Sequence, residues 1–145
     1  MHIRRLLAVA AVPLLLASVG CSDKDEEKNK EAAGKSCDGI LKPADAAAAL
    51  PSTIPAGITG ATFYEVQTAG ATKRYFAYVS GTDLVKTRDD IKAAYETAKI
   101  EITGTDQEEG AEADMEFKVG NDEGSVQVIP LCQGTLRVRY RVGPK

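Results

Sequence analysis

The sequence predicts an α+β domain in which one antiparallel sheet packs a single main helix on one face. Three observations support this. Residues 61–80 hold two runs rich in β-branched and aromatic residues. Residues 87–99 carry apolar side chains at helical spacing. Residues 111–142 alternate apolar and polar side chains, which is the period of a strand. The predicted order is β-β-α-β-β-β-β, preceded by a short alanine-rich helix.

The short helix is predicted over residues 42–50, where Pro43 suits a first helical turn, alanine dominates and Pro51 ends the helix. Two runs follow, 61–68 and 73–80. A four-residue segment separates them, which predicts a hairpin.

The main helix is predicted to begin at Thr87, with Asp90 three residues later as in a capping box. Lys99 closes it, since a cation is favoured at a helix C-terminus. One apolar stripe runs along this helix, formed by Ile91, Ala94, Tyr95 and Ala98. This stripe should face the sheet.

Four strands are predicted after the helix, over residues 100–105, 111–119, 125–131 and 135–142. In the second, alanine, methionine, phenylalanine and valine alternate with charged residues, and in the last, apolar residues alternate with arginine. Clean alternation indicates that one face of the sheet is buried and the other meets water.

The first 20 residues read as a secretory signal. Arg4 and Arg5 form a positive start, residues 6–20 are apolar, and small residues precede Cys21. With that cysteine, the segment resembles the lipobox signal of bacterial lipoproteins, although Ser18 stands where the family usually has Leu or Val. The resemblance implies that Cys21 carries a diacylglycerol and anchors the chain outside the cytoplasmic membrane. Alternatives are an ordinary cleaved signal and an uncleaved membrane anchor.

Residues 22–36 are dense in charge of both signs and lack large apolar side chains, which predicts a disordered tether. The predicted organisation is therefore a signal peptide (1–20), a lipidated cysteine with its tether (21–36) and one folded domain (37–145). A cysteine followed by a short alanine-rich helix resembles small lipoproteins of high-GC Gram-positive bacteria. That resemblance implies no specific activity.

The chain has three cysteines, of which one, Cys21, follows the signal and two, Cys37 and Cys132, lie in the predicted domain. If Cys21 is acylated, Cys37 and Cys132 remain in an oxidising compartment, where paired thiols persist. We predict a Cys37–Cys132 disulfide, worth roughly 4–5 kcal/mol on the chain-entropy model. A redox-active or metal-binding pair is the alternative, but the two residues lack the close spacing that such sites favour.

Composition excludes several classes of function. The chain has 21 acidic against 18 basic residues, and this mild acidity argues against a nucleic-acid binder. The only histidine, His2, lies in the signal, which excludes histidine-based hydrolase and zinc chemistry from the mature chain. We predict neither an enzyme nor a cofactor nor a metal site. An acidic run suggests calcium, but no stretch matches an EF-hand loop.

The most informative constellation is Arg137, Arg139 and Arg141, which lie on one face of the last predicted strand. Three interpretations are open. The arginines bind an anion, they form an ion-pair ladder with Glu112, Asp114 and Glu116, or their charge protects the sheet against pairing at its edge. A ladder would have to reach across the intervening strand, about 10 Å.

The sequence therefore predicts a membrane-anchored extracytoplasmic lipoprotein that acts as a non-enzymatic binding module, with an envelope protein or polymer as partner. One alternative is a small-ligand carrier with a pocket between the main helix and the hairpin, lined by Tyr64, Tyr75, Phe76 and Tyr78. A less favoured one is an enzyme that uses paired carboxylates.

Overall fold

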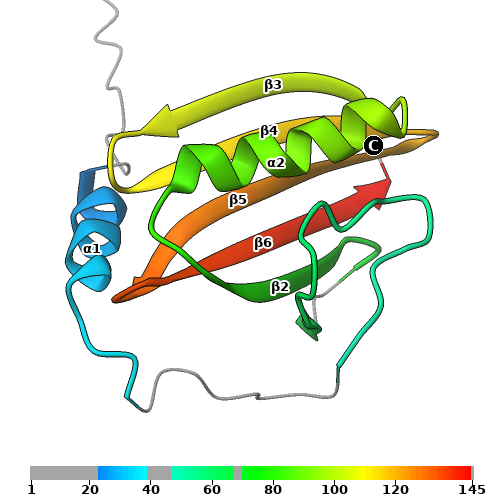
Figure 1. Ribbon diagram of the computed structural model, residues 1–145. Coiled ribbons are helices and arrows are strands. Elements are labelled where there is room, and N and C mark those ends of the chain that lie inside the picture. The colour runs from blue at the N-terminus through cyan, green and yellow to red at the C-terminus, as the bar shows by residue number, and fades with distance from the viewer. Residues whose placement is uncertain (1–22, 39–46, 67–69, 145) are drawn as a thin grey trace, which may run out of the picture.

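The computed structural model describes residues 23–38, 47–66 and 70–144 (Figure 1). Six strands form one antiparallel sheet in the order β1-β2-β6-β5-β4-β3. The predicted α+β class and the β-β-α-β-β-β-β order are confirmed. The strands are β1 (Phe63–Val66), β2 (Lys73–Ser80), β3 (Glu101–Glu108), β4 (Glu112–Val119), β5 (Asp122–Cys132) and β6 (Thr135–Pro144).

Alternating side chains divide the sheet into two faces. On one face apolar residues of β4, β5 and β6 are almost fully buried and form the core of the domain. These residues include Ala113, Met115, Phe117, Val126, Val128, Val138 and Tyr140. The opposite face carries the polar residues of the same strands, and it is called the open face below.

The main helix, α2 (Leu84–Thr97), begins earlier than its sequence predicts. Asp83 is the N-cap, and its side chain accepts a 2.8 Å hydrogen bond from the Lys86 N–H. The predicted start at Thr87 is therefore wrong, because Asp83 satisfies a free N–H of the first turn one turn earlier. Lys99, with a φ of 59°, follows the helix and turns the chain into β3.

The predicted apolar stripe of α2 partly faces the sheet. Ile91 and Tyr95 are fully buried, whereas Ala98 is exposed at the helix end. Tyr95 meets Phe117 of β4 edge to face, with ring centroids 4.9 Å apart. Arg88 is also buried, and its guanidinium donates a 3.1 Å hydrogen bond to the Asp106 carbonyl of β3. These contacts fix α2 over the β3–β4–β5 half of the sheet.

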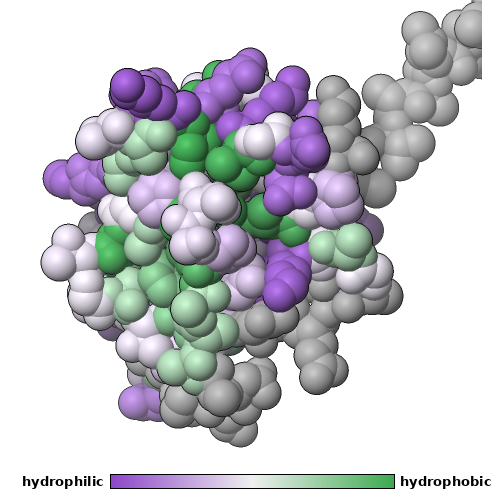
Figure 2. Space-filling view, turned by 90° about the vertical axis from the view of Figure 1, so that its right-hand side faces the viewer, coloured by the Kyte–Doolittle hydropathy of each residue, from purple (hydrophilic) through white to green (hydrophobic). Residues whose placement is uncertain are grey.

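Segment 47–62 covers the other half of the same face, in front of β6 and β2 in Figure 1. The Tyr140 hydroxyl donates a 2.6 Å hydrogen bond to the Ala56 carbonyl. At Gly57 the chain approaches α2 so closely that a Cβ would lie 2.7 Å from the Ile91 Cα. Figure 2 shows the molecule from the right-hand side of Figure 1, where hydrophobic residues gather in the middle and lower part of the surface, mostly below hydrophilic ones.

The predicted short helix over residues 42–50 lies partly outside the described residues. Its described part is not helical. Ala47 instead forms an antiparallel bridge with Tyr64 of β1. The prediction is wrong for residues 47–50 because pairing with β1 supplies the backbone hydrogen bonds that a helix would have made.

The predicted disorder of residues 22–36 is also wrong where the chain is described. Asp23–Ala33 form α1, which packs against β5 and lies at the end of the sheet where β5 ends (Figure 1). Glu26 pairs with Lys30 and Glu31 with Lys35, one helical turn apart. Such pairs support a helix that buries little apolar surface. The folded part of the chain therefore begins before Cys37.

Candidate functional site

The open face carries two rows of opposite charge, separated by one strand. Arg137, Arg139 and Arg141 (the arginine stripe) project from β6, and Glu112, Asp114 and Glu116 (the acidic strip) project from β4. β5 lies between them, as the sequence predicted. Arg139 is opposite Gln127, which is opposite Asp114; likewise Arg141, Ser125 and Glu116 lie in register. The face therefore reads positive, neutral and negative from β6 to β4.

No ion pair joins the arginine stripe to the acidic strip in the described part of the chain. Arg139 Nε instead donates a 3.1 Å hydrogen bond to Gln127 Oε1, and Gln127 Nε2 donates a 2.9 Å bond to Glu112 Oε2. The predicted ion-pair ladder is wrong, because β5 keeps the two rows too far apart for direct contact and an amide side chain fills the space.

The arginine stripe is incompletely satisfied. The Arg137 Nε is buried and has no hydrogen-bond partner. Burial, and secondarily the charge of Arg139, lowers the Arg137 pKa, while Tyr78 raises it. Within the described residues no hydrogen bond or ion pair is formed by the side chain of Arg141 or by that of Arg74, its register partner on β2. Apart from the Nε–H of Arg139, the stripe therefore presents N–H donors without acceptors among the described residues.

The acidic strip presents the opposite deficit. Burial, and then the nearby carboxylates of Glu112 and Asp106, raise the pKa of Asp114 to about 7 against the opposing effect of Arg139. Like charges that crowd one site favour the protonated form of one of them. The strip therefore crowds carboxyl groups together without an ion pair to a cation among the described residues.

An aromatic cluster borders the arginine stripe on the β1–β2 side. It consists of Tyr64, Phe76 and Tyr78, all partly exposed. Tyr64 stacks on Phe76 with centroids 5.3 Å apart, and Phe76 lies 5.4 Å from Tyr78. Sequence reasoning treated these rings together with Tyr75, but only Tyr75 reaches the core. The period of two along β2 separates Tyr75 from the other two hairpin rings on its strand.

The open face is hollowed between these groups. A groove of about 500 Å³ runs over β2, β6 and β5 as far as Asp114. Phe76 and Tyr78 line it on β2, and the three arginines line it on β6 together with Gln127 on β5. Such a surface offers guanidinium groups to carboxylate or phosphate oxygens and flat rings to an apolar partner.

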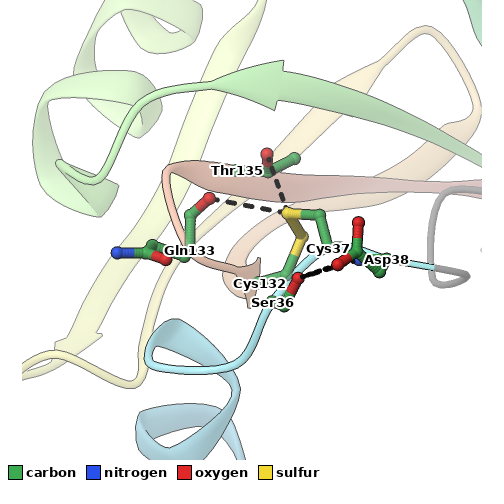
Figure 3. The surroundings of a disulfide bond; sticks show 6 residues. All are labelled: Ser36, Cys37, Asp38, Cys132, Gln133 and Thr135. Atoms are coloured by element: carbon green, nitrogen blue, oxygen red, sulfur yellow. Dashed lines mark hydrogen bonds between the residues drawn. A yellow bond between two sulfur atoms is a disulfide. The ribbon is translucent and has the colours of Figure 1, made fainter.

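The disulfide that the sequence predicted is present. Cys37 and Cys132 are joined across 95 residues, and their Cα atoms lie 5.1 Å apart. The Cys37 Sγ lies 3.5 Å from the Gln133 carbonyl oxygen and 3.6 Å from the Thr135 hydroxyl (Figure 3). The Gln133 N–H donates a 2.8 Å hydrogen bond to the Lys35 carbonyl. These contacts hold the end of the α1 segment to the β5–β6 turn.

The space between α2 and the hairpin is occupied by side chains. Ile91 and Tyr95 of α2 are fully buried, and Tyr75 and Ala77 of β2 are almost completely buried in the same hydrophobic cluster. The groove described above lies on the opposite side of the sheet. It is therefore not the pocket that the carrier alternative expects, and that alternative stays a prediction.

The remaining predictions concern residues or chemistry that the structure leaves untested. Cys21 and the signal peptide lie outside the described residues. In the part of the chain that the structure describes, no helix has the length and apolar character to cross a membrane. No group of three or more potential ligands for a metal ion is found there either. Asp106, Asp114 and Glu116 line a hollow of about 480 Å³, and the carboxylate-enzyme alternative stays untested.

Comparison of this chain with protein-family models, with curated proteins and with solved structures finds no match.

Proposed function

We propose that this protein is an extracytoplasmic lipoprotein, anchored through Cys21, that acts as a non-enzymatic interaction module through its open face. The observation that carries the interaction is the arginine stripe, which has no carboxylate partner among the described residues. The groove beside it brings the same guanidinium groups together with the aromatic cluster. A partner that presents carboxylate or phosphate groups fits this surface.

The anchor would hold the domain close to the bilayer. Since α1 begins at Asp23, only one residue separates it from Cys21. The Cα atoms of Cys21 and Asp23 are therefore at most about 7 Å apart. The disordered tether of the sequence prediction would have allowed about 20 Å as a flexible coil. Because α1 packs against β5 and the disulfide joins Cys37 to Cys132, the sheet would be held at a short distance from the anchor.

Intact mass of the protein extracted from membranes tests the anchor and the disulfide together. We expect the mass of residues 21–145 plus acyl chains, and a gain of two hydrogens on reduction. An unmodified Cys21 would contradict the anchor and leave the face to be tested separately.

Site-specific photocrosslinking tests the open face in intact membranes. A photoreactive residue at Gln127, at the centre of the open face, should form adducts. The same residue at Glu96, exposed on α2 across the molecule, should not. Adducts from Glu96 alone, or from neither position, would contradict the proposed role of the open face.

A further inference from the structure

We propose that the partner of the open face is a second copy of this chain, so that two open faces stack into a symmetric dimer. This inference rests on the proposed function, because it names the partner of the same surface. Among the described residues, the arginine stripe has no carboxylate acceptor and the acidic strip forms no ion pair. A second copy supplies both in one contact.

The strand register selects the geometry of this dimer. A twofold axis that runs along β5, in the plane between the two faces, exchanges the two sides of β5 without a shift along the strands. The arginine stripe of one copy then lies over the acidic strip of the other. Because Arg139 and Asp114 flank Gln127 in register, Arg139 meets the second copy's Asp114.

The next set of residues in register across the three strands gives the same result. Arg141 and Glu116 flank Ser125, so Arg141 meets the second copy's Glu116. Ser125 and Gln127 lie on the axis and meet their own counterparts. Every pair occurs twice by symmetry. An axis perpendicular to the strands would instead place arginine over arginine, which like charges disfavour. The charge pattern therefore favours the twofold axis along β5 over the axis perpendicular to the strands.

The location of α1 agrees with the same axis. α1 lies at the end of the sheet where β5 ends (Figure 1). An axis along β5 keeps both copies of α1 at the same end of the dimer, so both lipid anchors reach one bilayer. The perpendicular axis would place the two anchors at opposite ends of the sandwich, about 30 Å apart for strands of this length.

The size of the face suits a modest dimer. Rotation about β5 overlaps the five strands from β2 to β3, and five strands about 4.8 Å apart and about 26 Å long give a footprint of about 600 Å². A standard interface covers about 800 Å² per partner. Two sheets packed face to face at about 10 Å leave room for arginine and carboxylate side chains to meet across the gap. We therefore expect reversible association, which confinement to a membrane would favour.

A charge-swap experiment tests the dimer, using analytical ultracentrifugation of the processed chain in neutrally buoyant detergent. Arg139→Glu places two carboxylates opposite each other, and Asp114→Arg does the same with two cations. Each variant alone should associate at least about tenfold more weakly than the original chain. An equimolar mixture should recover the original affinity. The carboxylate introduced at position 139 of one chain then meets the guanidinium introduced at position 114 of the other, and the reciprocal pair is intact.

Matched variants on α2 serve as controls. Lys92→Glu and Glu96→Arg make the same changes of charge on the side of the molecule away from the open face, and neither should alter association. Recovery in the mixture also shows that both variants fold.

Three results would overturn the proposal. They are a chain that stays monomeric at about 1 mM, an Asp114→Arg variant that associates normally, and a mixture that fails to recover. A monomeric chain whose Gln127 photoadduct has the mass of a different molecule would refute self-association while leaving the proposed function in place.

Discussion

Arg139 Nε donates a 3.1 Å hydrogen bond to Gln127 Oε1, and this contact defines the character of the open face. A neutral amide on β5 spans the space between a cation on β6 and a carboxylate on β4. The amide satisfies one arginine only. The bond uses only the Nε–H of Arg139, so the terminal N–H groups of this arginine and the guanidinium groups of its neighbours remain available for both proposals.

Gln127→Met tests how much this contact contributes. Methionine keeps the volume but removes both hydrogen bonds of the amide, so we expect the free energy of unfolding to fall by about 1 kcal/mol. Urea denaturation measures the change. Gln107→Met is the control, because Gln107 is exposed on the edge strand β3, and it should cost less than about 0.5 kcal/mol. Equal effects of the two substitutions would contradict the role of Gln127.

Asp114 should make stability depend on pH. Its pKa is raised to about 7 in the folded protein by burial and by Glu112 and Asp106, against the opposing effect of Arg139, whereas an unfolded aspartate titrates near 4. Between about pH 4 and pH 7 the folded state binds more protons than the unfolded state. Stability contributed by this group is therefore present at low pH and lost as the pH rises towards 7.

Asp114→Asn should remove this dependence. In dilute solution, where the monomer predominates, the variant should gain stability relative to the original chain at pH 8 but not at pH 4. Thermal unfolding at the two pH values measures the difference. Glu27→Gln on the exposed surface of α1 should change neither value. A variant that follows the original pH profile would show that Asp114 titrates normally.

Gly124→Ala should destabilise the sheet strongly. A Cβ there would lie 2.3 Å from the Phe117 Cζ and 2.5 Å from the Arg141 carbonyl oxygen. Overpacking of this kind costs about 1–3 kcal/mol. Gly104→Ala is the matched control, since its nearest atom, Glu116 Oε2, lies at an ordinary 3.5 Å. Urea denaturation should separate the two, and equal midpoints would contradict the close packing of Phe117.

Loss of the disulfide should have the largest effect. Replacing Cys37 and Cys132 by serine opens a loop of 95 residues, which costs about 4–5 kcal/mol on the chain-entropy model. The double variant should unfold at much lower urea concentration, and reductant should lower the midpoint of the original chain alone. A midpoint that is insensitive to both changes would mean that the α1 segment and the β5–β6 turn hold together without the covalent link.

Local patterns predicted the strands and the main helix because each depends on near neighbours in the chain. Alternation placed the residues of β4 and β6 on their correct faces, since side chains of a strand point to opposite sides in turn. The start of α2 was missed because the sequence offers two candidate N-cap residues, Asp83 and Thr87. The hydrogen bond that selects Asp83 is seen only in the structure. α1 was missed because its charged composition also suits disorder, and only its ion pairs and its contact with β5 favour the helix.

The sequence by itself determined the α+β class, the order of strands and main helix along the chain, and the pairing of Cys37 with Cys132, because hydrophobic period and cysteine count carry that information. Only the tertiary structure decided how charges meet on the open face. Strand register aligned Arg139 with Gln127 and Asp114, and the width of β5 kept the cation and the carboxylate apart. Distances between strands are properties of the folded sheet, so only the structure could show that the two rows form no ion-pair ladder.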